Sequence, residues 1–280
     1  MTSVSASSPS ADTVAFIGGG NMASAIIGGL LKQGLAASQI QIVEPWAEQR
    51  SKLKADFGIT AQAAPGADLG SAGLVVWAVK PQTFKQAAQQ AGPHTRQALH
   101  LSVAAGIRSD SMAVWLDTQR IVRAMPNTPA LVGQGMTALF ARPAVSAADR
   151  LAIERVIEPT GELLWLDQEA QLDAVTALSG SGPAYVFYFL EAMVQAGSAM
   201  GLSREHAHQL AVQTFVGASA LAKASSEPPE TLRERVTSKG GTTYAALMAL
   251  EQSGVKQHFM QAMQAACKRA AELGDEYGSA

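Results

Sequence analysis

A glycine-rich segment near the start of the chain has the residue types that could hold a phosphate. Residues 14–23 read Val-Ala-Phe-Ile-Gly-Gly-Gly-Asn-Met-Ala, a short apolar run followed by a G-x-G-x-x-A pattern. Gly18 allows a tight turn, Gly20 lets the backbone approach a pyrophosphate, and Ala23 lets a helix pack closely on the preceding strand. Because the amides at a helix start bind phosphate, the segment predicts a dinucleotide site. A glycine-rich turn needed only for packing is the alternative.

An acidic residue follows the second apolar run of the chain. Glu44 comes about 20 residues after the glycine pattern, where a carboxylate binds the ribose 2′-hydroxyl in such sites. A carboxylate there would repel a 2′-phosphate and favour NADH, whereas Arg50 is near enough in sequence to pair with the extra phosphate of NADPH. Glu44 could equally be the solvated end of a strand. The sequence therefore leaves the choice between NADH and NADPH open.

Three further segments follow predicted strands and contain small residues or proline. They are Ala-Val-Lys-Pro at 78–81, Ala-Ala-Gly-Ile at 104–107 and Arg-Ala-Met-Pro-Asn-Thr-Pro at 123–129. Each could be a plain turn. Since ligands bind at the carboxyl ends of strands in open α/β sheets, we expect the three segments to be the walls of a nicotinamide pocket.

The second half of the chain contains a segment with the chemistry of an anion site, Val-Thr-Ser-Lys-Gly-Gly-Thr-Thr at 236–243. Ser238, the amides around Gly240 and Gly241, and the hydroxyls of Thr242 and Thr243 stand directly before a predicted helix. That arrangement suits a carboxylate at a helix N-terminus. The alternative is an ordinary helix cap after a flexible Gly-Gly turn, for which Thr242 alone would suffice.

The elements that position the first group of motifs alternate along the chain between short apolar runs and amphipathic stretches. This alternation predicts βαβ units and a mainly parallel sheet. Strands are expected at 14–17, 40–43, 74–79, 99–103 and 121–123, with further edge strands at 136–140 and 163–166. Helices are expected at 22–33, 46–57 and 147–157.

After residue 167 the strand pattern disappears and helical periodicity continues to the end of the chain. Helices are expected at 168–178, 183–199, 204–224, 229–236, 242–253 and 255–273, with an interruption at 177–185 where two glycines and a proline occur together. We therefore expect a flexible tail at 1–12, a dinucleotide-binding Rossmann-like domain at 13–166 and an all-α domain at 167–280. The apolar, small-residue helices suit contact between subunits, so a dimer is expected; a self-contained helical domain is the alternative.

Composition excludes several classes of protein. The 280 residues are 48% hydrophobic and 16% charged with a net charge of −2, which gives no reason to expect nucleic acid as a partner. A single cysteine, Cys267, excludes an internal disulfide framework and a cysteine-rich zinc site, and no metal is expected. No apolar run reaches the ~20 residues of a membrane span, and the start does not read as a secretory signal, so a cytoplasmic location is expected.

The histidines lie outside all of these motifs. We expect each of the five on the surface or at a helix end: His94, His100, His206, His208 and His258.

Taken together and in order, the motifs at 16–23, 78–81, 105–107, 123–129, 178–185 and 237–243 resemble those of the pyrroline-5-carboxylate reductase family. The early motifs are shared with other Rossmann dehydrogenases, while Leu-Ser-Gly-Ser-Gly-Pro-Ala-Tyr at 178–185 and Thr-Ser-Lys-Gly-Gly-Thr-Thr at 237–243 are specific. The resemblance implies reduction of 1-pyrroline-5-carboxylate to L-proline by hydride transfer from NADH or NADPH. It also implies a dimer formed by the helical domain, and a larger assembly of five dimers.

The resemblance also implies roles for individual residues. The family's substrate residues would be Ser238, Gly240, Gly241 and Thr242 around the carboxylate, with Thr243 reaching the ring nitrogen. Lys239 stands where the family often has proline, which leaves the amides of the loop intact. The cofactor residues would be Gly18, Gly20, Asn21, Met22, Ala23, Glu44, Ala78, Val79, Lys80, Pro81, Ala104, Gly106 and Asn127. The sequence assigns no role to Ser226 or Glu227 and identifies no general acid.

Two other functions are compatible with part of the pattern. A β-hydroxyacid dehydrogenase also joins a Rossmann half to a helical half, but it needs a catalytic lysine, and residues 168–199 contain none. A non-catalytic relative that only binds nucleotide would be expected to lose the substrate loop first, and residues 237–243 are intact.

Overall fold

The computed structural model describes residues 10–278 and divides the chain into two compact units. The first unit runs up to Ser181 and includes the residues from Ala266 onward, and the second is Gly182–Ala265. We call them the sheet unit and the helical unit. Within the described part of the chain, every helix is too short or too polar to span a bilayer.

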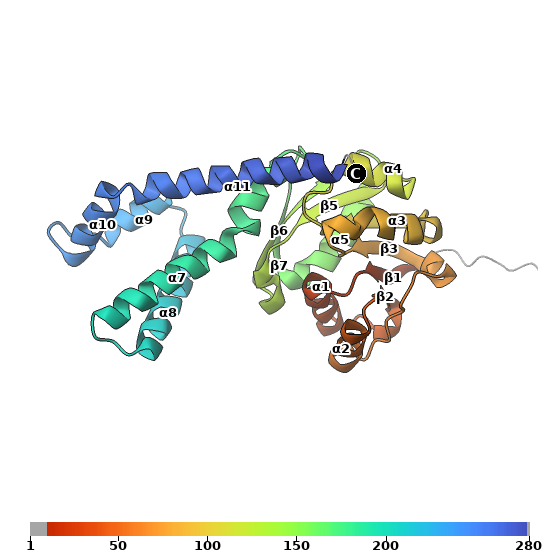
Figure 1. Ribbon diagram of the computed structural model, residues 1–280, viewed down its shortest axis with the longest axis horizontal. Helices are drawn as coiled ribbons and strands as arrows, with labels where there is room; N and C mark the ends of the chain where they lie inside the picture. The colour runs from red at the N-terminus through yellow and green to blue at the C-terminus, as the bar shows by residue number, and fades with distance from the viewer. Residues whose placement is uncertain (1–9, 279–280) are drawn as a thin grey trace, which may run out of the picture. The chain divides into compact units, whose positions relative to one another are not determined.

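The sheet unit is built on seven strands. They are β1 (Ser10–Ile17), β2 (Ile40–Val43), β3 (Ala72–Trp77), β4 (Leu99–Ser102), β5 (Ile121–Met125), β6 (Gly135–Ala141) and β7 (Gly161–Trp165). Their order is β2-β1-β3-β4-β5-β6-β7 (Figure 1), and among the described residues β5 and β6 form the one antiparallel pair, with β7 parallel to β6. The predicted Rossmann-like, mainly parallel sheet is therefore confirmed.

Two expectations about strand positions are wrong. The strand expected at 136–140 is not an edge strand, because Val122 to Met125 of β5 pair with the end of β6 while β7 pairs along its other side. The expected tail ends earlier than residue 12, because Ser10 pairs with Ala72 and β1 already begins there. Residues 1–9 of that tail lie outside the described residues.

Helices cover both faces of the sheet. Side chains of a strand point alternately to its two faces, and here the apolar side chains on both faces are buried against helices. These helices are α1 (Asn21–Lys32), α2 (Ala47–Phe57), α3 (Pro81–Thr95), α4 (Ser109–Leu116) and α5 (Ala147–Ile157). Phe16 and Val76 face a core shared with α1 and α5, whereas Ala15 and Trp77 face a second core shared with α3 and α4. The sheet is thus packed between helices on both faces.

The rest of the chain is helical. Its elements are α6 (Gln171–Val175), the π-helix η5 (Thr176–Gly180), α7 (Gly182–Ala199), α8 (Arg204–Ala224), α9 (Pro229–Arg235), α10 (Thr242–Gln252) and α11 (Val255–Gly278). The expected interruption near 177–185 occurs as the π-helix. The Cβ position of Gly180 lies against the end of the Met125 side chain of β5, so the backbone there passes close to the sheet. The secondary structure changes class after β7, whereas the compact units divide at Ser181 because α6 packs on β6.

The helical unit leaves many apolar side chains uncovered within one chain. Val194, Ala207 and Ala211 form a small core between α7 and α8. Large side chains on the same helices remain exposed, among them Phe187, Tyr188, Leu210 and Leu221. Exposed apolar surface of this kind marks an interaction site, which agrees with the expected self-association of the helices.

His100 contradicts the expectation that every histidine lies at the surface or at a helix end. It is 1% exposed in β4, whose four residues are all buried because helices cover both faces of the central strands. Its Nδ1 accepts a hydrogen bond from Trp77 Nε1 at 3.0 Å, so Nε2 carries the proton and donates it to the carbonyl of Thr95 at 3.1 Å. Desolvation by burial lowers the pKa of His100 from 6.5 to about 4, against the raising effect of the Thr95 bond.

This burial predicts a loss of stability in mild acid. Folded His100 stays neutral, whereas the unfolded chain takes up a proton below pH 6.5, so stability is fully present above pH 6.5 and is lost as the pH falls toward 4. At about 1.4 kcal/mol for each pH unit, protonation of His100 in the unfolded chain should lower the free energy of unfolding by roughly 3 kcal/mol between pH 6.5 and pH 4. Urea titrations of the native protein and His100→Asn at pH 7 and pH 4.5 should show a smaller pH effect in the variant.

His206→Asn serves as the control, because His206 is exposed on α8. It should keep the pH dependence of the native protein. An equal pH effect in His100→Asn and the native protein would show that His100 is not the group responsible.

Candidate active site

The strand order reverses between β1 and β3, and the ends of these two strands meet closely. From β1 the chain passes to β2 on one side and then returns to β3 on the other. Ala78 after β3 donates its amide to the carbonyl of Ile17 at the end of β1, at 2.8 Å. Gly18 has a φ of +94°, and a Cβ there would lie 2.7 Å from the Ala78 carbonyl oxygen. Such a reversal is where open α/β sheets bind ligands, and here only glycine fits.

The start of α1 has the properties of a phosphate site. Gly20 is the N-cap residue and makes no side-chain cap, and its Cβ position has nothing within 4 Å. The first-turn amides, those of Asn21, Met22 and Ala23, have no carbonyl partner within the helix. Ala23 itself is fully buried against the sheet. Open space in front of unpaired amides at a positive helix end fits the phosphates of a dinucleotide.

A cavity of about 630 Å³ opens beside this turn. Six of the residues expected to bind a cofactor line it: Gly18, Gly20, Glu44, Ala78, Val79 and Lys80. Residues without any motif line it too: Trp46, Gln49, Ala64, Pro65, Thr83 and Gln86. Several of these stand on the first turns of α2 and α3, and their position directly after β2 and β3 is the signal that could have identified them.

Glu44 is buried and its carboxylate connects two loops, so its interpretation as a solvated strand end is wrong. It is 8% exposed, and its two carboxylate oxygens accept the amides of Gly19 and Trp46, both at 2.9 Å. Gln49 Nε2 donates to the Gly19 carbonyl from the other side. These bonds fix the glycine-rich turn while Glu44 still lines the cavity.

The two basic residues near the cavity are placed differently. Arg50 turns back onto the backbone and donates to the carbonyls of Glu44 and Pro45 at 2.9 and 2.6 Å, and it is not among the cavity residues. Lys80 does line the cavity, with its Nζ 5.6 Å from the centre of the Trp46 ring. Pro81 follows it as the first residue of α3.

The loops after β4 and β5 do not line this cavity. Ala104 is buried, and Gly106 adopts a φ of +72°. Asn127 uses its side chain for structure, because Oδ1 accepts the amide of Met136 at 2.9 Å and Nδ2 donates to the carbonyl of Ser179 at 3.2 Å. The cavity thus brings together the part of the expected cofactor site around β1, β2 and β3.

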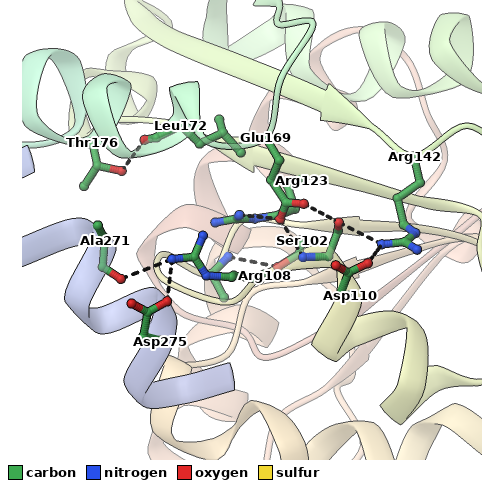
Figure 2. Close-up of polar contacts among 12 residues, drawn as sticks. Ser102, Arg108, Asp110, Arg123, Arg142, Glu169, Leu172, Thr176, Ala271 and Asp275 are labelled. Carbon is green, nitrogen blue, oxygen red and sulfur yellow. Dashed lines mark hydrogen bonds and ion pairs between the residues drawn. The ribbon is translucent and has the colours of Figure 1, made fainter. Parts of the chain in front are cut away.

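A partly buried charge network supports the loop after β4 (Figure 2). Arg123 of β5 pairs with Glu169 at 2.6 Å, and the Glu169 carboxylate accepts both the amide and the hydroxyl of Ser109 at the start of α4. Arg142 donates to the same hydroxyl at 3.0 Å. Burial alone would raise the pKa of Glu169, but the Ser109 hydroxyl and the Arg123 charge outweigh it, so this pKa is lowered. No sequence motif identified Glu169.

The expected substrate loop lies in the helical unit. Gly240 adopts a φ of +73°, and Gly241, whose amide donates to the Ser238 carbonyl at 3.0 Å, is the N-cap of α10 without a side-chain cap. The interpretation of Thr242 as the cap is therefore wrong, because Thr242 is the first residue of the helix. The side chains of Thr242 and Thr243 are exposed. The first-turn amides of α10 keep their capacity to bind an anion.

The close approach at Gly18 leads to a direct test. Gly18→Ala should weaken dinucleotide binding at least about tenfold, or by roughly 1.4 kcal/mol, because the new methyl group would push the strand ends apart. Fluorescence titration with NADH or NADPH measures the affinity. Gly34→Ala is the matched control, because Gly34 has a φ of +96° but open space around its Cβ position. Equal loss of affinity in both variants would assign the effect to backbone strain alone.

Comparison with known proteins identifies the family. Residues 169–273 match a family model described as pyrroline-5-carboxylate reductase dimerisation, and residues 13–106 match one described as NADP oxidoreductase, coenzyme F420-dependent. The pyrroline-5-carboxylate reductase of Pseudomonas aeruginosa is 46% identical over 267 residues, covering 95% of this chain and 98% of that protein.

Solved structures agree over a similar length. A pyrroline-5-carboxylate reductase from Coxiella burnetii superposes with a TM-score of 0.87 at 35% identity, covering 94% of this chain and 99% of that one. A pyrroline carboxylate reductase from Plasmodium falciparum, described with NADP bound, has a TM-score of 0.84 at 28% identity and covers 94% of this chain and 98% of that one. The chain belongs to the pyrroline-5-carboxylate reductase family.

Proposed function

We propose that the protein reduces 1-pyrroline-5-carboxylate to L-proline by hydride transfer from NADH or NADPH, the last step of proline biosynthesis. The observation that carries this proposal is family membership at 46% identity over 95% of the chain. The glycine-rich turn at the strand reversal and the uncapped start of α10 support it independently, since the reaction needs a dinucleotide and a small carboxylate.

The proposed role of the sheet unit is to bind the cofactor. Gly18 and Gly20 leave room for the pyrophosphate, and the amides of Asn21 and Met22 would bind its oxygens. The loops at 78–81 and 104–106 would line the ribose and the nicotinamide. A bound nicotinamide would supply the hydride, and the residues of the chain would orient it and exclude water.

The proposed role of the helical unit is to bind the substrate. Ser238 and the amides of Gly240, Gly241 and Thr242 would bind the carboxylate, and the Thr243 hydroxyl would contact the ring nitrogen. A threonine hydroxyl is too weak an acid to protonate an amine at neutral pH. The proton on the nitrogen would therefore already be on the imine or would come from water. Orientation of the reacting carbons at ~3–3.5 Å would be the main contribution of the chain.

The protein self-associates through the helical region, as the match of residues 169–273 to a dimerisation family indicates. We propose a homodimer in which a partner covers apolar residues of α7 and α8. Assembly of five dimers and a cytoplasmic location stay predictions from the sequence.

Glu44 is the proposed determinant of cofactor choice. Its carboxylate lines the cavity. Arg50, the residue expected to pair with a 2′-phosphate, is bound to backbone carbonyls, and Lys80 is the basic residue that lines the cavity. The arrangement supports a preference for NADH, because a 2′-phosphate near a fixed carboxylate would be repelled.

Removal of the Thr243 hydroxyl should separate chemistry from cofactor binding. We expect Thr243→Ala to lose about 10- to 100-fold in kcat/KM for 1-pyrroline-5-carboxylate, equivalent to roughly 1.4–3 kcal/mol, while the dinucleotide Kd is kept. NADH and NADPH oxidation is followed with this substrate and, separately, with a 3-oxo acid.

Thr214→Ala is the control, since the Thr214 hydroxyl donates to the Leu210 carbonyl within α8. This control should retain full activity. Activity of the native protein on the 3-oxo acid alone would overturn the proposed function, and loss of dinucleotide affinity in Thr243→Ala would contradict the proposed role of the loop.

Neutralising Glu44 should change the cofactor preference. Glu44→Gln keeps the size of the side chain and an oxygen for one of the two amides, but it removes the charge. We expect the ratio of kcat/KM for NADPH to that for NADH to rise about tenfold or more, because tenfold corresponds to only ~1.4 kcal/mol of repulsion. An unchanged ratio in steady-state assays would show that Glu44 only supports the loop.

A further inference from the structure

The last turns of α11 belong to the sheet unit and pack on the loop after β4. Helix α11 begins at Val255 in the helical unit, whereas residues from Ala266 onward belong to the sheet unit. A Cβ built on Gly106 would lie 3.2 Å from Tyr277 Cδ2 and 3.4 Å from Leu273 Cβ. The helix end is therefore in van der Waals contact with the loop that, under the proposed function, lines the nicotinamide.

Arg108, two residues farther along that loop, is fixed by the same helix end (Figure 2). Its Nη2 donates to Asp275 Oδ1 at 2.7 Å and to the Ala271 carbonyl at 3.3 Å. Part of the guanidinium lies against Gly274, where a Cβ would come within 3.0–3.1 Å of Nη2, Cζ and Nε. Two hydrogen bonds and a close contact with glycine hold this side chain, which is 35% exposed, against the end of α11.

Tyr277 connects this contact to the second loop of the expected nicotinamide pocket. Its ring lies beside Gly106 and is partly buried against the core of α3 and α4. Its hydroxyl accepts a hydrogen bond from Gln82 Nε2 at 2.9 Å. Gln82 is the second residue of α3 and directly follows Lys80 and Pro81. One side chain thus contacts the segments after both β3 and β4.

We propose that Asp275 and Tyr277 are positioning residues, which hold the loop at residues 104–108 and the start of α3 in the arrangement that receives the nicotinamide ring. The inference rests on the proposed function. Neither residue would contact the reacting atoms, and each acts through the loop that it fixes. A rigid loop is needed because a displacement of the reacting carbons by about 1 Å can cost on the order of 10²-fold in rate.

The test compares two neighbouring carboxylates on α11. Asp275→Asn weakens the bond to Arg108, whereas the control Glu276→Gln changes a residue whose carboxylate pairs with Arg269 of the same helix at 2.7 Å. Tyr277→Ala removes the ring, and Tyr277→Phe keeps the ring but removes the hydroxyl bond to Gln82. Turnover with 1-pyrroline-5-carboxylate, the dinucleotide Kd and the primary isotope effect with cofactor deuterated at C4 are measured for each.

We expect Tyr277→Ala to lose about 10- to 100-fold in kcat, with a larger isotope effect and a nearly unchanged dinucleotide Kd. Asp275→Asn should show a smaller loss of the same kind, Tyr277→Phe should recover much of the rate, and Glu276→Gln should match the native protein. A purely structural role would lower the melting temperature without changing the isotope effect of the folded enzyme. Native-like kcat and isotope effect in both Tyr277→Ala and Asp275→Asn would overturn the inference.

Failure of the native protein to reduce the imine would refute the proposed function itself. A second measurement still tests whether the end of α11 holds the loop in that case. Hydrogen exchange at the amides of residues 104–108 should be faster in Tyr277→Ala and Asp275→Asn than in Glu276→Gln. Equal exchange in all three variants would show that the end of α11 does not hold the loop.

Discussion

The candidate cofactor site depends on the close approach of two strand ends, β1 and β3. The amide of Ala78 bonds to the last carbonyl of β1, and the next residue, Gly18, has no room for a Cβ beside the Ala78 carbonyl. The sheet reverses its order at this point, so the helix after β1 and the helix after β3 diverge and leave space between them. Glu44 then fixes the turn by accepting the amide of Gly19. The cavity is a consequence of these backbone contacts.

The loops farther along the sheet are held by charge. Arg123 and Glu169 form a pair at 2.6 Å in which the arginine is buried and the carboxylate is partly exposed, so loss of Glu169 would leave a buried arginine without its carboxylate partner. Glu169 also accepts two hydrogen bonds from Ser109, so the network fixes the start of α4 directly after the loop at 104–108. The end of α11 contacts that loop from elsewhere in the chain. The loop is thus contacted from two sides, by the charge network and by the end of α11.

Local patterns predicted the elements whose limits are set locally. The expected limits of α5 and α8 are those observed, and Ser146 and Ser203 set the starts of these helices by accepting the amides of Asp149 and His206. The limits of β1 and the place of β6 depend on pairing with distant strands, which periodicity does not reveal. The burial of His100 likewise follows from helices on both faces of β4. Tertiary contacts decided each of these cases.

The candidate site also contains features that the local sequence predicts and features that depend on tertiary contacts. The glycine-rich turn carries its chemistry in consecutive residues, so its place between the first strand and a helix was predictable. Glu44 also fixes the glycine-rich turn, because its carboxylate accepts the amides of Gly19 and Trp46. The Asn127 side chain is bound to the backbone of Met136 and Ser179. These partners are distant in sequence or bound through the backbone, which has no residue-specific signal. Trp46 and Gln49 follow β2 without any motif and were missed for that reason.

The central claim is hydride transfer from a nicotinamide to the imine carbon of a pyrroline carboxylate, and deuterium transfer tests it most directly. The protein is incubated with 1-pyrroline-5-carboxylate and NADH or NADPH carrying deuterium at both C4 positions, and the product is analysed by mass spectrometry. We expect L-proline with one deuterium on the ring carbon that was double-bonded to nitrogen. Proline without deuterium, or no proline while a 3-oxo acid accepts the label, would contradict it.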